Sequence, residues 1–203
     1  MALPPPDVAA RECDRELLAR AQACAPAIRR RSLELARLLP AWHPLAGVAE
    51  DVARLLEEPR GVRLAYYPAT PVAAGTGAAW HAGFFLLELK PRRGGPPRRL
   101  PCIVLFQPCK AFSDPELRCV LAHELAHAAD HRIEEVVYDY ERALSTHFPA
   151  DFRSPYPHPS LLLSRPGTRA VAAEELGALA EKRPAEFLAA LRRCWKELQP
   201  VEG

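Results

Sequence analysis

The sequence of 203 residues lacks three features that would narrow its class at once: a C-x-x-C pair, a strong excess of one charge and a long apolar run. The 27 basic and 25 acidic side chains leave a formal charge of +2, which argues against a broad surface for nucleic acid or membrane. The six cysteines lie largely among apolar neighbours, so we expect reduced core residues. They are Cys13, Cys24, Cys102, Cys109, Cys119 and Cys194.

No apolar run approaches the roughly 18 residues that a membrane-spanning helix needs. The first residues also lack a basic segment followed by an apolar stretch, which is the pattern of a secretory signal. We therefore expect a cytoplasmic protein without a membrane partner. The apolar content of 49% is enough for one domain with a substantial core.

Helical patterns open the chain, strand patterns follow and helical patterns return, which predicts an α+β fold rather than alternating α/β units. We expect residues 1–60 to form an N-terminal helical segment that packs on a domain at residues 61–203, as one folded unit overall. The first part contains three helical patterns separated by prolines, at 7–21, 27–39 and 48–57.

Three strand patterns follow, each rich in β-branched or aromatic residues and bounded by glycine or proline. They cover residues 62–69, 79–90 and 100–107 and predict a small, mainly antiparallel sheet. Between the second and third patterns, four arginines stand among prolines and glycines, which predicts a charged loop. They are Arg92, Arg93, Arg98 and Arg99.

A helix is predicted from residue 114 to residue 131, because an N-cap residue, either Ser113 or Asp114, precedes a proline. Further helical patterns follow at 134–148 and, broken near Pro184, at 168–198.

The helix at 114–131 contains His123, Glu124 and His127 in the order H-E-x-x-H. Two histidines four residues apart stand about 40° apart around a helix axis and one turn apart along it, so both imidazoles can reach one ion. Glu124 projects about 100° from His123, where it would meet a water on that ion and act as a general base. Apolar residues on the other side would anchor the helix: Leu117, Leu121, Leu125 and Ala128.

The order of strand, turn, H-E-x-x-H helix, proline-rich segment and later acidic helix resembles the zincin metallopeptidases over about residues 62–198. It is most similar to the glutamate-zincin (gluzincin) branch, in which a glutamate from a second helix completes the site. The resemblance implies a metallohydrolase that cleaves peptide bonds in a peptide or protein substrate with one zinc ion per chain. His123 and His127 would be ligands and Glu124 the general base.

The run HELAHAAD also resembles, locally, two small peptidase families with H-E-x-x-H-x-x-D. One contains bacterial regulator-type peptidases, and the other contains mitochondrial proteases that process an ATP synthase subunit. The second family has an arginine three residues after the aspartate, where this sequence has Ile133, and Arg132 comes one position early.

We expect the third zinc ligand on the helical pattern that begins near residue 168. A carboxylate turned toward the core is costly unless it is paired or metal-bound. Glu175 falls at the edge of the buried side of the helical wheel, whereas Glu174 lies about 60° away on the other side, so Glu175 is preferred. Glu181 is a weaker candidate. The wheel places Val171, Ala172, Leu176 and Leu179 on the buried side.

Asp130 and His131 follow the motif, and we prefer Asp130 as an acceptor that orients an imidazole. His131 stands about 6 Å beyond His127 along the helix, so it joins the ligands only if the chain turns sharply at residue 130, as in families with glycine there. Hydrolysis also needs a donor to the oxyanion, and the sequence leaves five residues open. They are Tyr138, Tyr140, Tyr156, His147 and His158.

Two other functions fit the same motif. A non-catalytic zinc-binding scaffold is one, although it would have no need of Glu124. A DNA-associated protease is the other, and the arginine-rich loop would supply its contacts, but a net charge near zero provides no broad basic face and we expect no nucleic-acid partner. A peptide substrate is expected to add as a strand to an exposed sheet edge, at residues 84–88 or 103–107.

Overall fold

A computed structural model describes residues 13–58, 62–75, 77–89, 96, 98–155 and 170–201. Helices precede and follow a small sheet in these residues, which confirms the α+β prediction. Within the same ranges, no helix combines the length and the apolarity that spanning a membrane requires.

The chain divides into two compact units, and each is built from segments that lie far apart in the sequence. The sheet unit contains the described residues within Met1–Leu18, Val62–Lys110 and His158–Lys196. The helical unit contains those within Ala19–Gly61, Ala111–Pro157 and Glu197–Gly203. The part expected to form a domain at residues 61–203 therefore contributes to both units.

A four-stranded sheet in the order β3-β4-β1-β6 forms the centre of the sheet unit. β3 runs antiparallel to β4, with Phe84 opposite Ile103, whereas β1 runs parallel to β4, with Leu64 opposite Ile103. The sheet is therefore mixed rather than mainly antiparallel. Three of the strands coincide with the strand patterns, and the fourth lies where a helix was predicted: β1 (Arg63–Tyr67), β3 (Ala82–Leu89), β4 (Arg98–Phe106) and β6 (Trp195–Glu197).

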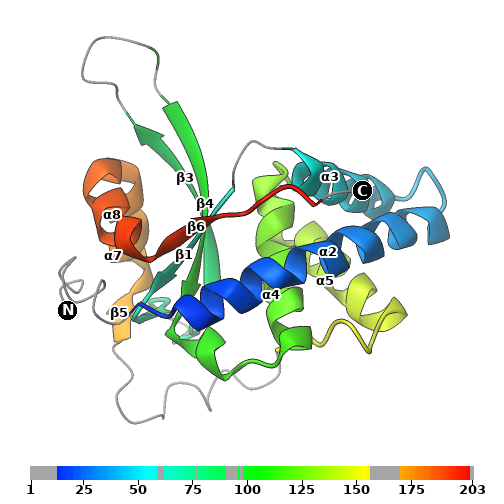
Figure 1. Cartoon of the computed structure of the whole chain (residues 1–203), viewed down its shortest axis with the longest axis horizontal. Coiled ribbons are helices and arrows are strands. Elements are labelled where there is room, and N and C mark those ends of the chain that lie inside the picture. The colour runs from blue at the N-terminus through cyan, green and yellow to red at the C-terminus, as the bar shows by residue number, and fades with distance from the viewer. Residues whose placement is uncertain are drawn as a thin grey trace. The chain divides into compact units, whose positions relative to one another are not determined.

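Helices α7 (Ala173–Lys182) and α8 (Pro184–Leu191) cover one face of this sheet, as Figure 1 shows. The break between them at Pro184 was predicted. Alternate residues of a strand point to the same face, and the alternating β4 residues that belong to this core are buried. The rings of Phe85 and Phe187 lie 5.0 Å apart, so sheet and helix interlock there. The fully buried β4 residues of this core are Cys102, Val104 and Phe106, and Leu100 of the same core is 5% exposed.

Among the described strands, β3 is an edge of the sheet and β4 is an interior strand. Residues 103–107 are therefore not an available edge, because β4 pairs with strands on both sides, while residues 84–88 stay a candidate. β4 also begins earlier than predicted, and Arg99 within it pairs with Glu88 at 3.0 Å across the two strands. Arg92 and Arg93 lie outside the described residues.

A second, two-stranded sheet in this unit pairs β2 (Thr70–Val72) with β5 (Ala170–Ala172) in parallel. The helix that was predicted to begin near residue 168 therefore begins at Ala173. Val171 and Ala172 belong to the strand. The helical wheel that placed these two residues on the buried side of the helix was therefore wrong.

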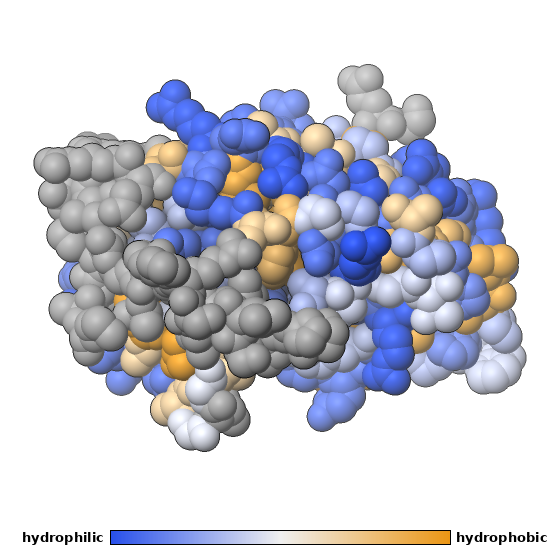
Figure 2. Space-filling view, turned by 90° about the horizontal axis from the view of Figure 1, so that it is seen from below, coloured by the Kyte–Doolittle hydropathy of each residue, from blue (hydrophilic) through white to orange (hydrophobic). Residues whose placement is uncertain are grey.

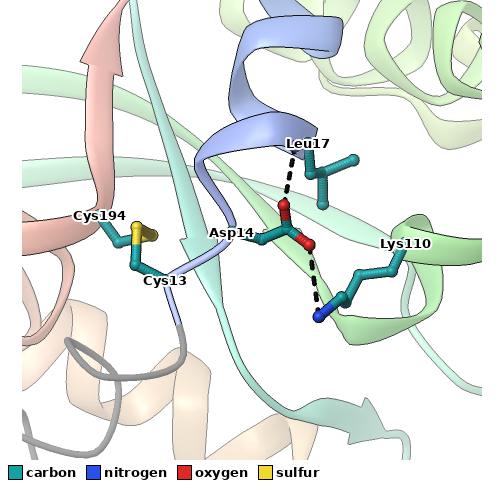
Figure 3. Close-up of a disulfide and its surroundings, with 5 residues drawn as sticks. All are labelled: Cys13, Asp14, Leu17, Lys110 and Cys194. Atoms are coloured by element: carbon teal, nitrogen blue, oxygen red, sulfur yellow. Dashed lines mark hydrogen bonds and ion pairs between the residues drawn. A yellow bond between two sulfur atoms is a disulfide. The ribbon is translucent and has the colours of Figure 1, made fainter.

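A disulfide joins Cys13 to Cys194 in the sheet unit (Figure 3), which corrects the expectation that all six cysteines are reduced. These two residues are 181 positions apart, and no spacing in the sequence marks them as a pair. Next to Cys13, the Asp14 carboxylate accepts a hydrogen bond of 2.9 Å from the Leu17 N–H and lies 3.3 Å from Nζ of Lys110. Asp14 thus acts as an N-cap. The other four cysteines are free and buried, as expected.

Helix α2 (Arg15–Leu38) runs straight through Pro26, although two separate helices were predicted on either side of that residue. A proline inside a helix costs about 3 kcal/mol, because it removes a backbone hydrogen bond and crowds the preceding turn. The apolar stripe continues across the proline, and its burial offsets that cost. The buried residues of this stripe include Ala25, Ile28 and Leu35.

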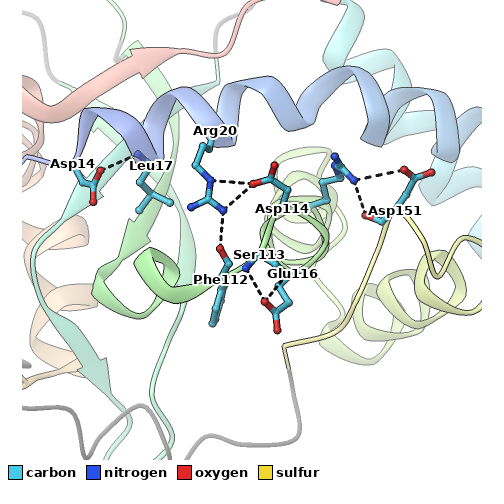
Figure 4. Close-up of polar contacts among 9 residues, drawn as sticks. Asp14, Leu17, Arg20, Phe112, Ser113, Asp114, Glu116 and Asp151 are labelled. Atoms are coloured by element: carbon cyan, nitrogen blue, oxygen red, sulfur yellow. Dashed lines mark hydrogen bonds and ion pairs between the residues drawn. The ribbon is translucent and has the colours of Figure 1, made fainter.

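Three further helices of the helical unit pack against one another: α3 (Pro44–Glu57), α4 (Asp114–Ala128) and α5 (Glu134–His147). Polar contacts join α2 to the rest of this unit. The Arg20 guanidinium donates to Asp114 at 2.8 Å, as Figure 4 shows, and the hydroxyls of Ser32 and Tyr140 lie 2.7 Å apart in the core.

On the face drawn in Figure 2, hydrophilic residues predominate among the described residues, and hydrophobic residues form small separate patches. Large exposed apolar side chains are few in the described parts of the chain, and Trp42 is the most exposed of them, at 82%.

Candidate metal centre

Helix α4 begins as the sequence predicted, with Ser113 as the N-cap residue and a proline in the first turn. The N–H and the hydroxyl of Ser113 both donate to the Glu116 carboxylate, at 2.8 and 2.7 Å (Figure 4). Every residue from 119 to 126 is buried, so the second half of the helix is enclosed on all sides rather than on one face. His123 and Glu124 are each only 7% exposed as a result.

The imidazoles of His123 and His127 converge, as their spacing predicted. Their Nε2 atoms lie 3.3 Å apart. The carboxylate of Glu134, in the first turn of α5, completes a triangle with them: Oε2 lies 3.5 Å from Nε2 of His123, and Oε1 lies 3.5 Å from Nε2 of His127. Among the described residues, these three side chains form the one group able to hold a metal ion.

This triangle has the dimensions of a zinc site. Ligand atoms about 2.0–2.1 Å from a tetrahedral zinc ion stand about 3.4 Å from one another. The two Nε2 atoms, 3.3 Å apart, match that value, and each of them lies 3.5 Å from a different oxygen of the Glu134 carboxylate. Two imidazoles and one carboxylate are also a donor set that zinc takes in catalytic sites, where the fourth position stays open for water or substrate.

A sharp turn after α4 brings Glu134 to the histidines. The N–H of His131 donates to the carbonyl of Ala126, and the N–H of Asp130 donates to the carbonyl of His127. These two bonds define a Schellman motif, in which the residue after the C-cap adopts a left-handed conformation. Asp130 has a φ of +72°, a region that glycine fills most often but that aspartate tolerates.

A sharp turn at residue 130 was expected to be necessary for His131 to become a ligand. The turn is present, but the imidazole of His131 does not join the other candidate ligands. Its Nε2 lies 3.1 Å from Oδ2 of Asp51 on α3 instead. Asp130 was expected to orient an imidazole, but its side chain is 78% exposed and pairs with Arg132 at 2.8 Å. Asp130 and His131 instead form the turn that brings Glu134 next to the two histidines.

Each histidine ring is oriented through its Nδ1 atom. Nδ1 of His127 lies 2.8 Å from the carbonyl oxygen of His131, so it donates there and leaves Nε2 to bind an ion. Nδ1 of His123 lies 3.3 Å from Oε2 of Glu141, within ion-pair distance but without the geometry of a hydrogen bond. A carboxylate behind a histidine ligand is a recurrent arrangement in metal sites, because it fixes the ring and makes the ligand more basic.

Glu141 is a buried carboxylate, only 3% exposed, that no sequence argument had selected. Its Oε1 accepts a hydrogen bond of 2.8 Å from the Ser154 hydroxyl and a longer one of 3.4 Å from the Cys119 thiol. Burial is the main reason why the pKa of Cys119 is well above its usual range, and the Glu141 charge adds to the effect, so the thiol keeps its proton. Glu141 is thus held in place from the side opposite His123.

Negative charge surrounds His123. Burial alone would lower the pKa of His123, but the contact with Glu141 and the charges of Glu124, Glu141 and Glu134 together raise it above its ordinary value. The same set of carboxylates that favours a proton on the ring favours a cation at its Nε2. Glu124 is one of the charges that raise the pKa of His123, and its role as a general base stays a prediction.

The candidate oxyanion donors lie in different parts of the structure. Tyr138 lies on α5, one turn after Glu134, and its ring centroid is 4.8 Å from that of His123. Burial and then the charges of the three nearby carboxylates raise the pKa of Tyr138, so its phenol is neutral. Tyr140 is fully buried against Ser32, away from solvent. Tyr156 and His158 lie outside the described residues.

The remaining candidate donor, His147, lines a different space. A cavity of about 480 Å³ lies between the start of α3 and the side of α5 that faces away from Glu134. His43 and Asp139 line it together with His147. His147 therefore has no place among the groups around His123.

The prediction that Glu175 is the third ligand stays a prediction. Glu175 lies in the first turn of α7, in the sheet unit, whereas both histidines belong to the helical unit. It is exposed rather than turned toward a core, as is Glu174, whose carboxylate accepts a hydrogen bond of 2.8 Å from the Ala74 N–H. The prediction that Glu175 faces the core and Glu174 does not was therefore wrong.

Comparisons of the chain with protein-family models, with curated proteins and with solved structures found no match. Function has to be inferred from the site itself. The site offers two oriented imidazoles and the Glu134 carboxylate at ligand distance. The carboxylate of Glu141 next to them is buried.

Proposed function

We propose that this protein is a zinc-dependent metallohydrolase that cleaves peptide bonds, with one zinc ion per chain. The observation that supports it most directly is the convergence of His123, His127 and Glu134: the two Nε2 atoms lie 3.3 Å apart, and each is 3.5 Å from one oxygen of the carboxylate. The resemblance of the H-E-x-x-H segment to zincins supports the same reaction, and it supports a peptide or protein as the substrate.

In this proposal, each residue of the centre has one task. His123, His127 and Glu134 hold the ion. Glu141 and the carbonyl of His131 keep the two rings turned toward it. A bound zinc ion would polarise the scissile carbonyl and lower the pKa of a water molecule to near 7.

Glu124 completes the reaction as general base and then as general acid. Its carboxylate takes a proton from the attacking water and returns it to the nitrogen of the leaving amine, so that the enzyme ends each cycle unchanged. Its low exposure of 7% supports this role, since a buried carboxylate would be held in a fixed position beside the attacking water.

Two features favour a catalytic centre over a purely structural zinc site. Structural zinc ions usually have four protein ligands, whereas the group found in the described part of the chain has three. A structural site would also have no need of a buried carboxylate at position 124. A cytoplasmic location is part of the proposal. The Cys13–Cys194 disulfide bears on it, because stable disulfides are rare in cytosolic proteins.

The decisive experiment compares the native protein with Glu124→Gln and with Glu135→Gln, an exposed acid on the first turn of α5. Zinc content is measured by elemental analysis, and hydrolysis is measured on casein and on a library of quenched peptides. We expect one zinc in all three proteins, native activity in Glu135→Gln and a loss of about 10³-fold in Glu124→Gln. A native protein that binds zinc but hydrolyses no peptide would overturn the peptidase proposal.

A further inference from the structure

We infer that the Tyr138 hydroxyl donates a hydrogen bond to the carbonyl oxygen of the scissile peptide bond as negative charge develops on it. This inference rests on the proposed hydrolysis and names a further catalytic residue for it. It begins from a requirement of the reaction, because the oxygen of an attacked carbonyl becomes an anion and needs a donor close by.

The position of Tyr138 on α5 ties it to the metal-binding group. Glu134, Tyr138 and Glu141 occur at positions i, i+4 and i+7, so they share one face of the helix. Glu134 meets Nε2 of both histidines, and Glu141 meets Nδ1 of His123. Tyr138 stands between them along the helix, with its ring 4.8 Å from the His123 ring and tilted by 60°.

The charges around Tyr138 show why a donor is needed at this point. Glu134 and Glu141 lie one turn to either side of Tyr138 on the same face of α5, so carboxylates flank its side chain. Ionised carboxylates only accept hydrogen bonds, and an oxyanion formed among them would be repelled. A neutral phenol is a group that can offset this repulsion, because its O–H donates.

Exposure distinguishes Tyr138 from the tyrosine two residues later. Tyr138 is 43% exposed, so a substrate can reach it, whereas Tyr140 is 0% exposed and its hydroxyl is engaged with Ser32. Tyr138 keeps its proton throughout the reaction in this role. It forms a hydrogen bond with the developing anion and transfers nothing, which leaves proton transfer to Glu124.

The test replaces Tyr138 with phenylalanine, which keeps the ring against His123 and removes only the hydroxyl. Tyr140→Phe is the matched control on the same helix. For each variant, zinc content, kcat, KM and the melting temperature are measured with a peptide that the native protein cleaves. Inhibition by a phosphonamidate peptide is measured as well, because its anionic oxygens resemble the developing oxyanion.

We expect Tyr138→Phe to bind one zinc ion with native affinity and to keep KM within about twofold. Its kcat should fall about 10²-fold, and the affinity for the phosphonamidate should fall in parallel, as for the loss of one oxyanion donor. Tyr140→Phe should keep kcat and melt at a lower temperature, since it loses a buried hydrogen bond.

Native kcat in Tyr138→Phe would overturn the inference while leaving the proposed hydrolysis intact. A loss of zinc from Tyr138→Phe would also overturn it, because the tyrosine would then act by supporting His123. If the native protein bound zinc and cleaved no peptide, the proposed function itself would fail, and the role of Tyr138 with it. The three outcomes are distinguished by measuring the native protein first.

Discussion

Nδ1 of His123 lies 3.3 Å from Oε2 of Glu141, and both side chains are buried. This pair turns Nε2 of the imidazole toward His127 and Glu134 before any ion binds. Glu141 is in turn held by the Ser154 hydroxyl. The arrangement prepares the site, because the ring loses little rotational freedom when it takes up a metal.

Glu141→Gln should weaken zinc binding by about 10- to 100-fold, the usual effect of removing such an orienting partner. The amide fills the same space but no longer carries the charge that makes the imidazole a better ligand. Affinity can be measured by competition with a chromogenic chelator. Glu135→Gln serves as the control for loss of one negative charge on α5, and a native-like affinity in Glu141→Gln would contradict the orienting role.

Glu134→Ala and Glu175→Ala separate the two candidates for the third ligand. We expect Glu134→Ala to lower zinc affinity at least tenfold, because it removes a carboxylate with one oxygen 3.5 Å from Nε2 of His123 and the other 3.5 Å from Nε2 of His127. Glu175→Ala should bind zinc like the native protein. The reverse result would support the glutamate that the resemblance to gluzincins favours, and Glu174→Ala provides a neighbouring control.

Asp130 provides a test of the turn that follows α4. Its φ of +72° suits glycine and strains a β-branched residue. Asp130→Gly should therefore fold as stably as the native protein, whereas Asp130→Val should lose about 1–2 kcal/mol of unfolding free energy. Asp130→Val should also bind zinc more weakly, since Glu134 depends on this turn. Denaturant titration and zinc competition measure the two effects, and equal behaviour of the variants would mean that the turn does not position Glu134.

The disulfide can be counted directly. Denatured protein prepared without reductant should present four free thiols to a chromogenic reagent, and six after reduction. Cys13→Ser should lower the free energy of unfolding by about 2–4 kcal/mol, because the crosslink closes a long loop in the unfolded chain. The double replacement of Cys13 and Cys194 should be no less stable than the single one. Six thiols before reduction would show that the bond is absent under those conditions.

The metal-binding histidines could be predicted from the sequence because their relation is local. Four residues on one helix fix the positions of His123 and His127, whatever the rest of the chain does. Glu134 could not be assigned in the same way. Its approach depends on a left-handed residue at position 130, and the sequence has aspartate there instead of the glycine that would have indicated a sharp turn.

Glu141 and Tyr138 carried a weaker signal. Glu134, Tyr138 and Glu141 form a polar stripe at helical spacing on α5, and such a stripe is typical of a solvated face. Only the contact between α4 and α5 shows that Glu141 is covered.

The longer strands were predictable from the sequence, whereas the three-residue strands β5 and β6 were not. β1, β3 and β4 coincide with alternating or apolar runs of ordinary length. β5 and β6 contain three residues each, too few for a pattern, and they exist because distant strands offer them hydrogen bonds. Pro26 was predicted to end a helix, and this was wrong. Buried apolar residues on both sides of Pro26 keep α2 continuous.

The interleaving of the two units along the chain has a consequence for the order of events on the ribosome. Helices α3, α4 and α5, which include every residue of the proposed metal centre, have all been synthesised by residue 147. The sheet unit is completed later, because α8, β6 and Cys194 follow some forty residues after α5. Cys13, the partner of Cys194, is synthesised long before it. A nascent chain can therefore contain the helices of the proposed metal centre while Cys13 is still a free thiol, and the crosslink cannot close until Cys194 has been synthesised.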